Sequence, residues 1–127
     1  MILHVALAFI LIFFTDKPGP PLGPFAITGM AETSFILGWN PPEYDGGLPI
    51  LEYNIEKREV GKKAWQKVET IEANKTNVQV TGMKKNISYH FRVSARNEMG
   101  WSSPLSPDES ITVGKRFSEF KSYKTIF

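Results

Sequence analysis

The stretch Tyr89-His-Phe-Arg-Val-Ser-Ala-Arg-Asn-Glu-Met-Gly100 decides the fold of this chain. Its apolar residues Tyr89, Phe91, Val93 and Ala95 alternate with polar or charged ones. Successive side chains of a strand point to opposite faces, so this alternation predicts a strand with one face in a core and the other in water. Half-buried strands of this kind are typical of the antiparallel sheets of sandwiches and barrels.

The same alternation recurs on both sides of this stretch. It predicts further short strands over residues 25–30, 34–39, 50–59, 64–70, 76–81 and 110–113. Turn signals such as Asp45-Gly46-Gly47 and Gly61-Lys62-Lys63 separate the strands, and no segment has the period of a helix. Short strands with turn signals every 8–12 residues or so predict an all-β fold, an antiparallel β-sandwich of about seven strands.

Two aromatic residues are expected to hold this sandwich together. Trp39 ends an alternating run and is expected between the two sheets. Tyr89 follows Met83 at the spacing of a tyrosine corner, in which the phenol hydroxyl bonds to the backbone a few residues upstream. The expected structural core combines these residues with inward positions of the neighbouring strands: Trp39, Tyr53, Ile55, Met83, Tyr89, Phe91 and Val93.

The 127 residues suffice for one domain, which we expect over residues 24–114. Residues 16–23 are rich in proline and glycine and are interpreted as a semi-rigid linker. Residues 1–15 form an apolar leader, interpreted either as signal-like or as an artefact of the gene model. As a helix this leader would span about 20 Å, short of the ~30 Å membrane core. Residues 115–127 are expected to form a disordered tail.

Composition argues against several classes of function. The chain has no cysteine, and its histidines are His4 in the leader and His90 on the solvent face of a strand. Neither a nucleophile dyad nor a zinc site can be assembled from these residues. The net charge of +2 is too small to indicate nucleic-acid binding. We therefore expect no enzyme activity, no cofactor and no metal site.

Two features are candidates for protein docking. The first is a basic hairpin surface formed by Lys57, Arg58, Lys62 and Lys63, for which a merely solvated hairpin face is the alternative. The second is Trp101, which we expect to pack against the last strand, with an exposed partner contact as the alternative. Two glycosylation sequons, at Asn74 and Asn86, matter only if the chain is secreted.

The spaced motifs of the chain resemble the fibronectin type III domain. They are Trp39-Asn-Pro-Pro42, Asp45-Gly46-Gly47, Tyr53, Trp65, Gly82-Met83, Tyr89 and Phe91-Arg-Val-x-Ala-x-Asn97-x-x-Gly100. The run Asp16-Lys-Pro-Gly-Pro-Pro21 and Ser102-Ser103-Pro104 narrow the resemblance to the copies in giant sarcomeric proteins such as titin and twitchin. Met83 stands where the family usually has leucine, a swap that conserves volume.

This resemblance implies an immunoglobulin-like sandwich in which an odd number of strands places the two chain ends at opposite poles. It also implies a non-enzymatic module of a longer parent chain, flanked by neighbouring modules. Its implied partners are myosin or other thick-filament components, and its implied location is the cytoplasmic A band of the sarcomere. The alternative is an extracellular or membrane-anchored adhesion or receptor module, secreted or placed at the cell surface by means of the leader. A scaffold module beside a muscle kinase is a further one.

Overall fold

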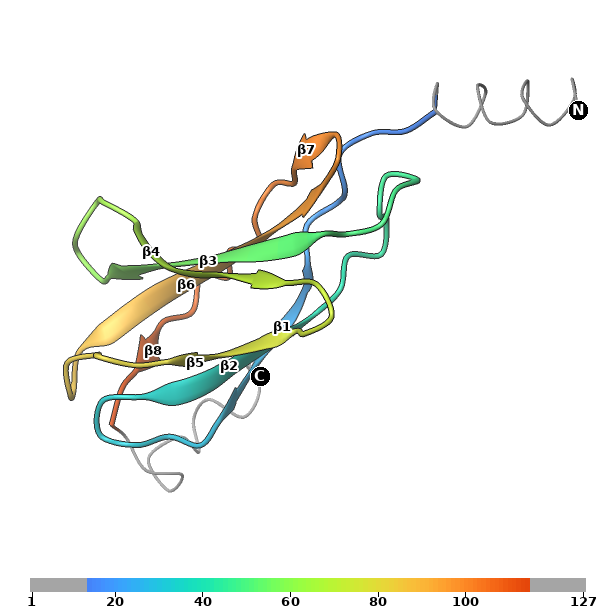
Figure 1. Ribbon diagram of the computed structural model, residues 1–127. Helices are drawn as coiled ribbons and strands as arrows, with labels where there is room; N and C mark the ends of the chain where they lie inside the picture. The colour runs from blue at the N-terminus through green and yellow to red at the C-terminus, as the bar shows by residue number, and fades with distance from the viewer. Residues whose placement is uncertain (1–13, 115–127) are drawn as a thin grey trace, which may run out of the picture.

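Two antiparallel sheets pack face to face in the computed structural model, which describes residues 14–114 (Figure 1). The smaller sheet has the order β1-β2-β5, and the larger sheet has the order β4-β3-β6-β7, with β8 also paired to β6. Their bounds are β1 Leu22–Thr28, β2 Phe35–Asn40, β3 Glu52–Glu59, β4 Gln66–Glu72, β5 Asn77–Val80, β6 Ser88–Asn97, β7 Gly100–Trp101 and β8 Ile111–Thr112. The predicted all-β sandwich is confirmed. No helix able to cross a membrane occurs among the described residues.

The core lies between the sheets and follows the alternation in the sequence. Along β6 every second residue from Tyr89 to Asn97 is buried. All the residues expected in the core are buried, and the full set is Phe25, Phe35, Leu37, Trp39, Tyr53, Ile55, Val78, Val80, Met83, Tyr89, Phe91, Val93, Ala95, Ile111 and Val113. Because these side chains come from both sheets, their burial holds the two layers together.

Aromatic contacts and one phenol hydrogen bond fix how the layers meet. The Trp39 ring lies edge-on to Tyr53, with the ring centroids 5.3 Å apart. Phe35 packs on Phe91 in the same manner, with centroids 5.4 Å apart. The Tyr89 hydroxyl accepts a hydrogen bond from the Lys84 backbone N–H at 3.0 Å, the bond expected of a tyrosine corner.

The last edge of the larger sheet is broken into pieces, which brings the number of strands to eight. β7 pairs with the end of β6, an isolated bridge joins Val93 to Leu105, and β8 pairs with the start of β6. Pro104 and Pro107 lie between these pieces. The pairing with β6 also slips from piece to piece, from Arg96 with Trp101 to Val93 with Leu105 and then to Tyr89 with Ile111, so the pieces do not form one regular ladder.

The segment interpreted as a linker packs against the domain. The Asp16 N–H donates to the Gly46 carbonyl and the Gly19 N–H to the Tyr44 carbonyl, both at 2.9 Å. Pro21 is fully buried, and β1 already begins at Leu22. Residues 16–23 are interpreted as a semi-rigid linker, and within them Pro21 also contributes to the packing of the sandwich.

The incoming and outgoing ends of the described chain lie at opposite poles (Figure 1). Asp16 lies beside Gly46 in the loop that follows β2. Gly114 lies beside Glu32 in the turn that precedes β2, and beside Lys85. Since β2 runs from one pole to the other, its two flanking loops mark the two ends of the module. The tail and residues 1–13 of the leader lie outside the described residues.

Candidate protein-docking surfaces

Opposite charges face each other across β3 and β6 on the outer face of the larger sheet. The register pairs Glu56 with Arg92 and Glu52 with Arg96. Arg92 donates to both carboxylate oxygens of Glu56, through Nε at 2.9 Å and Nη2 at 3.2 Å. Arg96 Nε donates to Glu52 Oε1 at 2.9 Å. Each pair is half-buried, which makes it less exposed to screening than a free surface pair.

Tryptophans flank these ion pairs at both ends. The Arg92 guanidinium lies 4.2 Å from the centre of the Trp65 ring, and the Arg58 guanidinium lies 5.0 Å from it. At the other end Arg96 lies 5.8 Å from the Trp101 ring. We call this array the tryptophan–arginine ladder, which consists of Trp65, Arg58, Arg92, Glu56, Glu52, Arg96 and Trp101.

The two carboxylates of the tryptophan–arginine ladder are each paired with one of its arginines. Exposed ion pairs and cation–π contacts each contribute up to about 1 kcal/mol, so several together stiffen the face without dominating stability. Because Arg92 and Arg96 already have carboxylate partners, this face offers little free charge to a ligand. What it offers to a partner is the tryptophan surface, chiefly that of Trp101.

The residues of the basic hairpin surface do not share one face. Lys57 lies on the inner side of β3, where its Nζ donates to the Met83 sulfur at 3.5 Å. Arg58 lies on the outer side, and its guanidinium donates to the Lys62 carbonyl at 2.7 Å. Lys62 and Lys63 lie in the exposed turn between β3 and β4. A docking role for this set stays a prediction, now restricted to Arg58 and the turn.

Trp101 differs from the expected packing against the last strand. It forms β7 with Gly100, pairs with Arg96 of β6, and is 40% exposed. The reason is that the chain turns back immediately after Asn97, so the indole is left at the rim of the sheet. Trp101 is therefore exposed, and its role as a partner contact stays a prediction.

The outer face of the smaller sheet has the opposite character. A shallow groove of about 440 Å³ runs over β1, β2 and the start of β5. No charged residue lines it, and its lining is Pro24, Ala26, Thr28, Ile36, Gly38, Trp39, Asn40, Thr76 and Asn77. Gly38, one of the lining residues, has no side chain to fill the groove.

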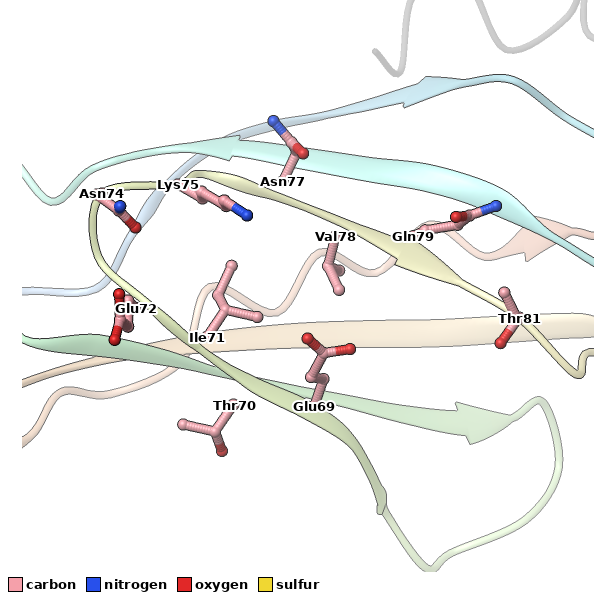
Figure 2. Close-up of a pocket in the computed structure, with 10 residues that line it drawn as sticks. All are labelled: Glu69, Thr70, Ile71, Glu72, Asn74, Lys75, Asn77, Val78, Gln79 and Thr81. Atoms are coloured by element: carbon pink, nitrogen blue, oxygen red, sulfur yellow. The ribbon is translucent and has the colours of Figure 1, made fainter.

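A second groove lies between the edges of the two sheets, where β4 faces β5 (Figure 2). Its volume is about 620 Å³. Figure 2 shows Ile71 and Glu69 of β4 pointing into it from one side and Val78 of β5 from the other. The exposed sequon residue Asn74 lies in the turn that closes one end.

A buried amide fastens the incoming segment at the N-terminal pole. The Asn97 side chain is fully buried, and its Nδ2 donates to the carbonyl oxygens of Asp16 at 2.7 Å and Asp45 at 2.8 Å. Its Oδ1 accepts from the Met99 N–H at 2.8 Å. A single side chain therefore joins three segments that are distant in the sequence, which orders the loops around the incoming chain.

The pKa values of one surface ion pair and of one core residue are shifted. A hydrogen bond from Lys62 lowers the pKa of Glu59, and that carboxylate raises the pKa of Lys62. Burial raises the pKa of Tyr53. Within residues 14–114, no three His, Cys, Asp or Glu side chains gather closely enough to hold a metal ion. His90 sits half-buried on β6, opposite Arg58.

The tryptophan–arginine ladder is not evident from the sequence as a unit. The alternating charges of both strands are visible in the sequence, since Glu52 and Glu56 alternate with apolar residues as Arg92 and Arg96 do. Pairing them requires the register between strands far apart in the chain, which periodicity alone does not determine. The burial of Asn97 likewise depends on remote partners, Asp16 and Asp45, which local sequence does not reveal.

Comparisons with known proteins agree with this architecture. The sequence model of the fibronectin type III domain matches residues 19–112. Titin of Drosophila melanogaster is 40% identical over 103 residues, a match that covers 81% of this chain and 1% of titin. Human slow-type myosin-binding protein C is 33% identical over 100 residues, which cover 79% of this chain and 9% of that protein.

A solved structure shows the same fold. The kinase region of twitchin from C. elegans superposes with a TM-score of 0.71 at 30% identity, covering 80% of this chain and 18% of that one. The chain thus spans a small fraction of the length of the relatives that it matches. Together, the sandwich topology, the tyrosine corner and the match over residues 19–112 place the chain in one family. The chain belongs to the fibronectin type III family.

Proposed function

We propose that this chain is one module of a giant muscle protein, where it serves as a non-enzymatic bead and docking platform on the thick filament. The observation that carries the proposal is the separation of the incoming and outgoing chain ends to opposite poles. Modules with ends so placed form a rod when they follow one another. The similarity to titin and to myosin-binding protein C supports muscle as the setting.

The fastening of the incoming chain supports a rigid rather than a loosely tethered bead. Asp16 and Gly19 are hydrogen-bonded to the loop after β2, and Asn97 holds Asp16 from the other side. A segment tied at several points transmits the orientation of whatever precedes it. In such a rod the neighbouring modules are the first partners, and myosin or another thick-filament component of the A band is the second.

Sedimentation with myosin filaments tests the docking half of the proposal. The full chain and a head-to-tail dimer of it are each spun with and without filaments. We expect the dimer to pellet with the filaments more strongly than the single chain, because two linked sites bind with avidity. If both stay in the supernatant whether or not filaments are present, the thick-filament assignment is wrong.

Small-angle scattering of the same dimer tests the rod. We expect a maximum dimension near twice that of the single chain, since the poles are opposite. A dimer that folds back on itself to a compact shape contradicts the rod.

A further inference from the structure

We propose that the free edge of β5 binds an extended, basic peptide segment, which is added as a further strand to the smaller sheet. The site is the groove between β4 and β5 in Figure 2. On the face turned to the groove, the bound segment carries both an apolar residue, which packs on Ile71 and Val78, and a lysine or arginine, which meets Glu69. This site does not depend on the thick-filament assignment.

Only every second residue of β5 hydrogen-bonds to β2. The backbone N–H and C=O groups of the residues between them point toward the groove. The Trp39 N–H donates to the Thr76 carbonyl at 3.0 Å. In an antiparallel pair, bonded and non-bonded residues alternate, so Val78 and Val80 exchange bonds with β2. The backbone N–H and C=O of Asn77 and Gln79 therefore point away from β2. Within residues 14–114 no strand pairs with that side of β5.

β4 faces the same groove but is protected against strand addition. Its pairing with β3 shifts between Ile55 and Glu56, which leaves Val68 as an extra, bulged residue. Glu69 lies on the inner side of β4, opposite Ile55. Bulges and inward-pointing charges are the devices by which proteins blunt a strand edge.

β5 carries neither device. Its register with β2 is unbroken from Asn77 to Val80, and no proline or charged residue occurs in it. An edge that is regular, uncharged and unpaired is the edge most able to accept another strand. β5 is four residues long, so the added strand would span about 13 Å at ~3.3 Å per residue.

The walls of the groove select the chemistry of the segment. Ile71 and Val78 form an apolar floor on which alternate side chains can pack. Glu69 and Glu72 line the groove and make no ion pair within residues 14–114, in contrast to Glu52 and Glu56. Lys75, at the closed end, is the basic residue among the lining. A basic residue in the bound segment would therefore meet an unpaired carboxylate at the middle of the site.

The test uses the full chain and a short acetylated peptide, called the valine–lysine peptide, in which every second residue is by turns valine and lysine and threonine fills the positions between them. We expect binding to shift the amide signals of Asn77 and Gln79 in NMR spectra and to slow their exchange with solvent. A valine–glutamate peptide of the same length is the charge control and should not bind, because Glu69 and Glu72 would repel it. Equal binding of both peptides, no binding of the valine–lysine peptide, or shifts confined to the tryptophan–arginine ladder would overturn the proposal.

A proline at position 79 separates strand addition from other modes of binding. Gln79→Pro removes the N–H that faces the groove and spares the bonds between β5 and β2. We expect it to weaken peptide binding by about tenfold, the equivalent of one or two hydrogen bonds. Gln79→Val is the matched control, because it keeps the N–H and should bind as the wild type does. A folded Gln79→Pro variant with unchanged affinity would overturn the proposal.

A second measurement covers the case in which Gln79→Pro fails to fold. The valine–lysine peptide is methylated on the backbone nitrogens of every second residue, in both possible phases. We expect one phase to lose binding and the other to keep it, because only one row of donors faces β5. Identical binding of both methylated peptides contradicts a strand added at this edge. Glu69→Gln should weaken binding and reduce its dependence on salt.

Discussion

The two sheets differ in how far their charged side chains and backbone groups find partners within the domain. On the larger sheet, acids of β3 lie opposite arginines of β6, and tryptophans cover both ends of the row. On the smaller sheet, no charged residue lines the groove over β1 and β2, and the edge of β5 has no strand beside it within the described chain. Surface charge on the larger sheet is thus largely structural, whereas the backbone edge of β5 has no pairing strand within the described residues.

The two sheets nevertheless share one interior. Trp39 and Phe35 of the smaller sheet pack edge-on against Tyr53 and Phe91 of the larger one. Their contacts do not distinguish the sheets but join them. Differences in stability should therefore arise mainly in the core, and differences in binding mainly on the faces.

The largest expected effect comes from breaking what the sheets share. Trp39→Ala should lower the free energy of unfolding by about 3–5 kcal/mol, because it removes a buried ring and leaves a cavity beside Tyr53. Urea unfolding followed by circular dichroism measures it. Trp101→Ala is the matched control, since that indole is 40% exposed and should cost about 1 kcal/mol or less. Similar losses for both tryptophans would contradict the assignment of core and rim.

A smaller effect is expected from breaking the ladder. Arg92→Ala removes two hydrogen bonds to Glu56 and the contact with Trp65, and should cost about 1–2 kcal/mol. A double-mutant cycle with Glu56→Gln isolates the ion pair, whose coupling should be about 0.5–1 kcal/mol and should fall as salt is added. A coupling of zero at low salt would show that the ladder is not a structural device.

A substitution that adds a side chain to the groove over β1 and β2 should raise the free energy of unfolding instead of lowering it. Gly38→Ala should stabilise the domain by about 0.4–1 kcal/mol, because the backbone there is not left-handed and the new methyl would meet Ala26 Cβ at an ordinary 3.5 Å. Gly46→Ala is the contrasting control. Gly46 has a φ of +81°, and a methyl there would collide with the Asp16 carbonyl oxygen, so that variant should be destabilised. Destabilisation by Gly38→Ala would mean that this glycine is needed for packing.

The smallest expected effect concerns pH. Lys62 holds the pKa of Glu59 below its ordinary value in the folded state. The folded state then binds fewer protons than the unfolded state as the pH falls, so the contribution of Glu59 is complete above the ordinary carboxyl pKa. It is lost as the pH falls through the lowered value. The urea midpoint of Glu59→Gln should depend less on acid pH than that of the wild type, and an identical dependence would contradict the pair.

The sequence predicts the fold correctly where the burial of a residue follows from the alternation within its own strand. Phe35, Leu37 and Trp39 alternate within β2, and the same period buries every second residue of β6. Local alternation needs no knowledge of the partner strand. Features that join distant segments were not readable. Examples are the pairing of Glu56 with Arg92 and the burial of Asn97.

The sequence pattern also does not predict which residues are buried at the edges of the domain. Residues 16–23 looked like a spacer because proline and glycine dominate them, yet Pro21 is buried against the domain. Trp101 looked like a core residue by its type, yet it lies at the rim of β7. In both cases the outcome depends on what the rest of the fold leaves uncovered, which composition does not specify.

Amide hydrogen exchange along β5 tests most directly the claim that one sheet ends at an open edge. Val78 and Val80 should exchange slowly, because their N–H groups are bonded to β2, whereas Asn77 and Gln79 should exchange nearly as fast as an unstructured peptide. Slow exchange at all four residues would mean that the edge is covered in solution. Slow exchange at Asn77 and Gln79 alone would mean that β5 pairs with β2 in the opposite phase. Either result would contradict an open edge at Asn77 and Gln79.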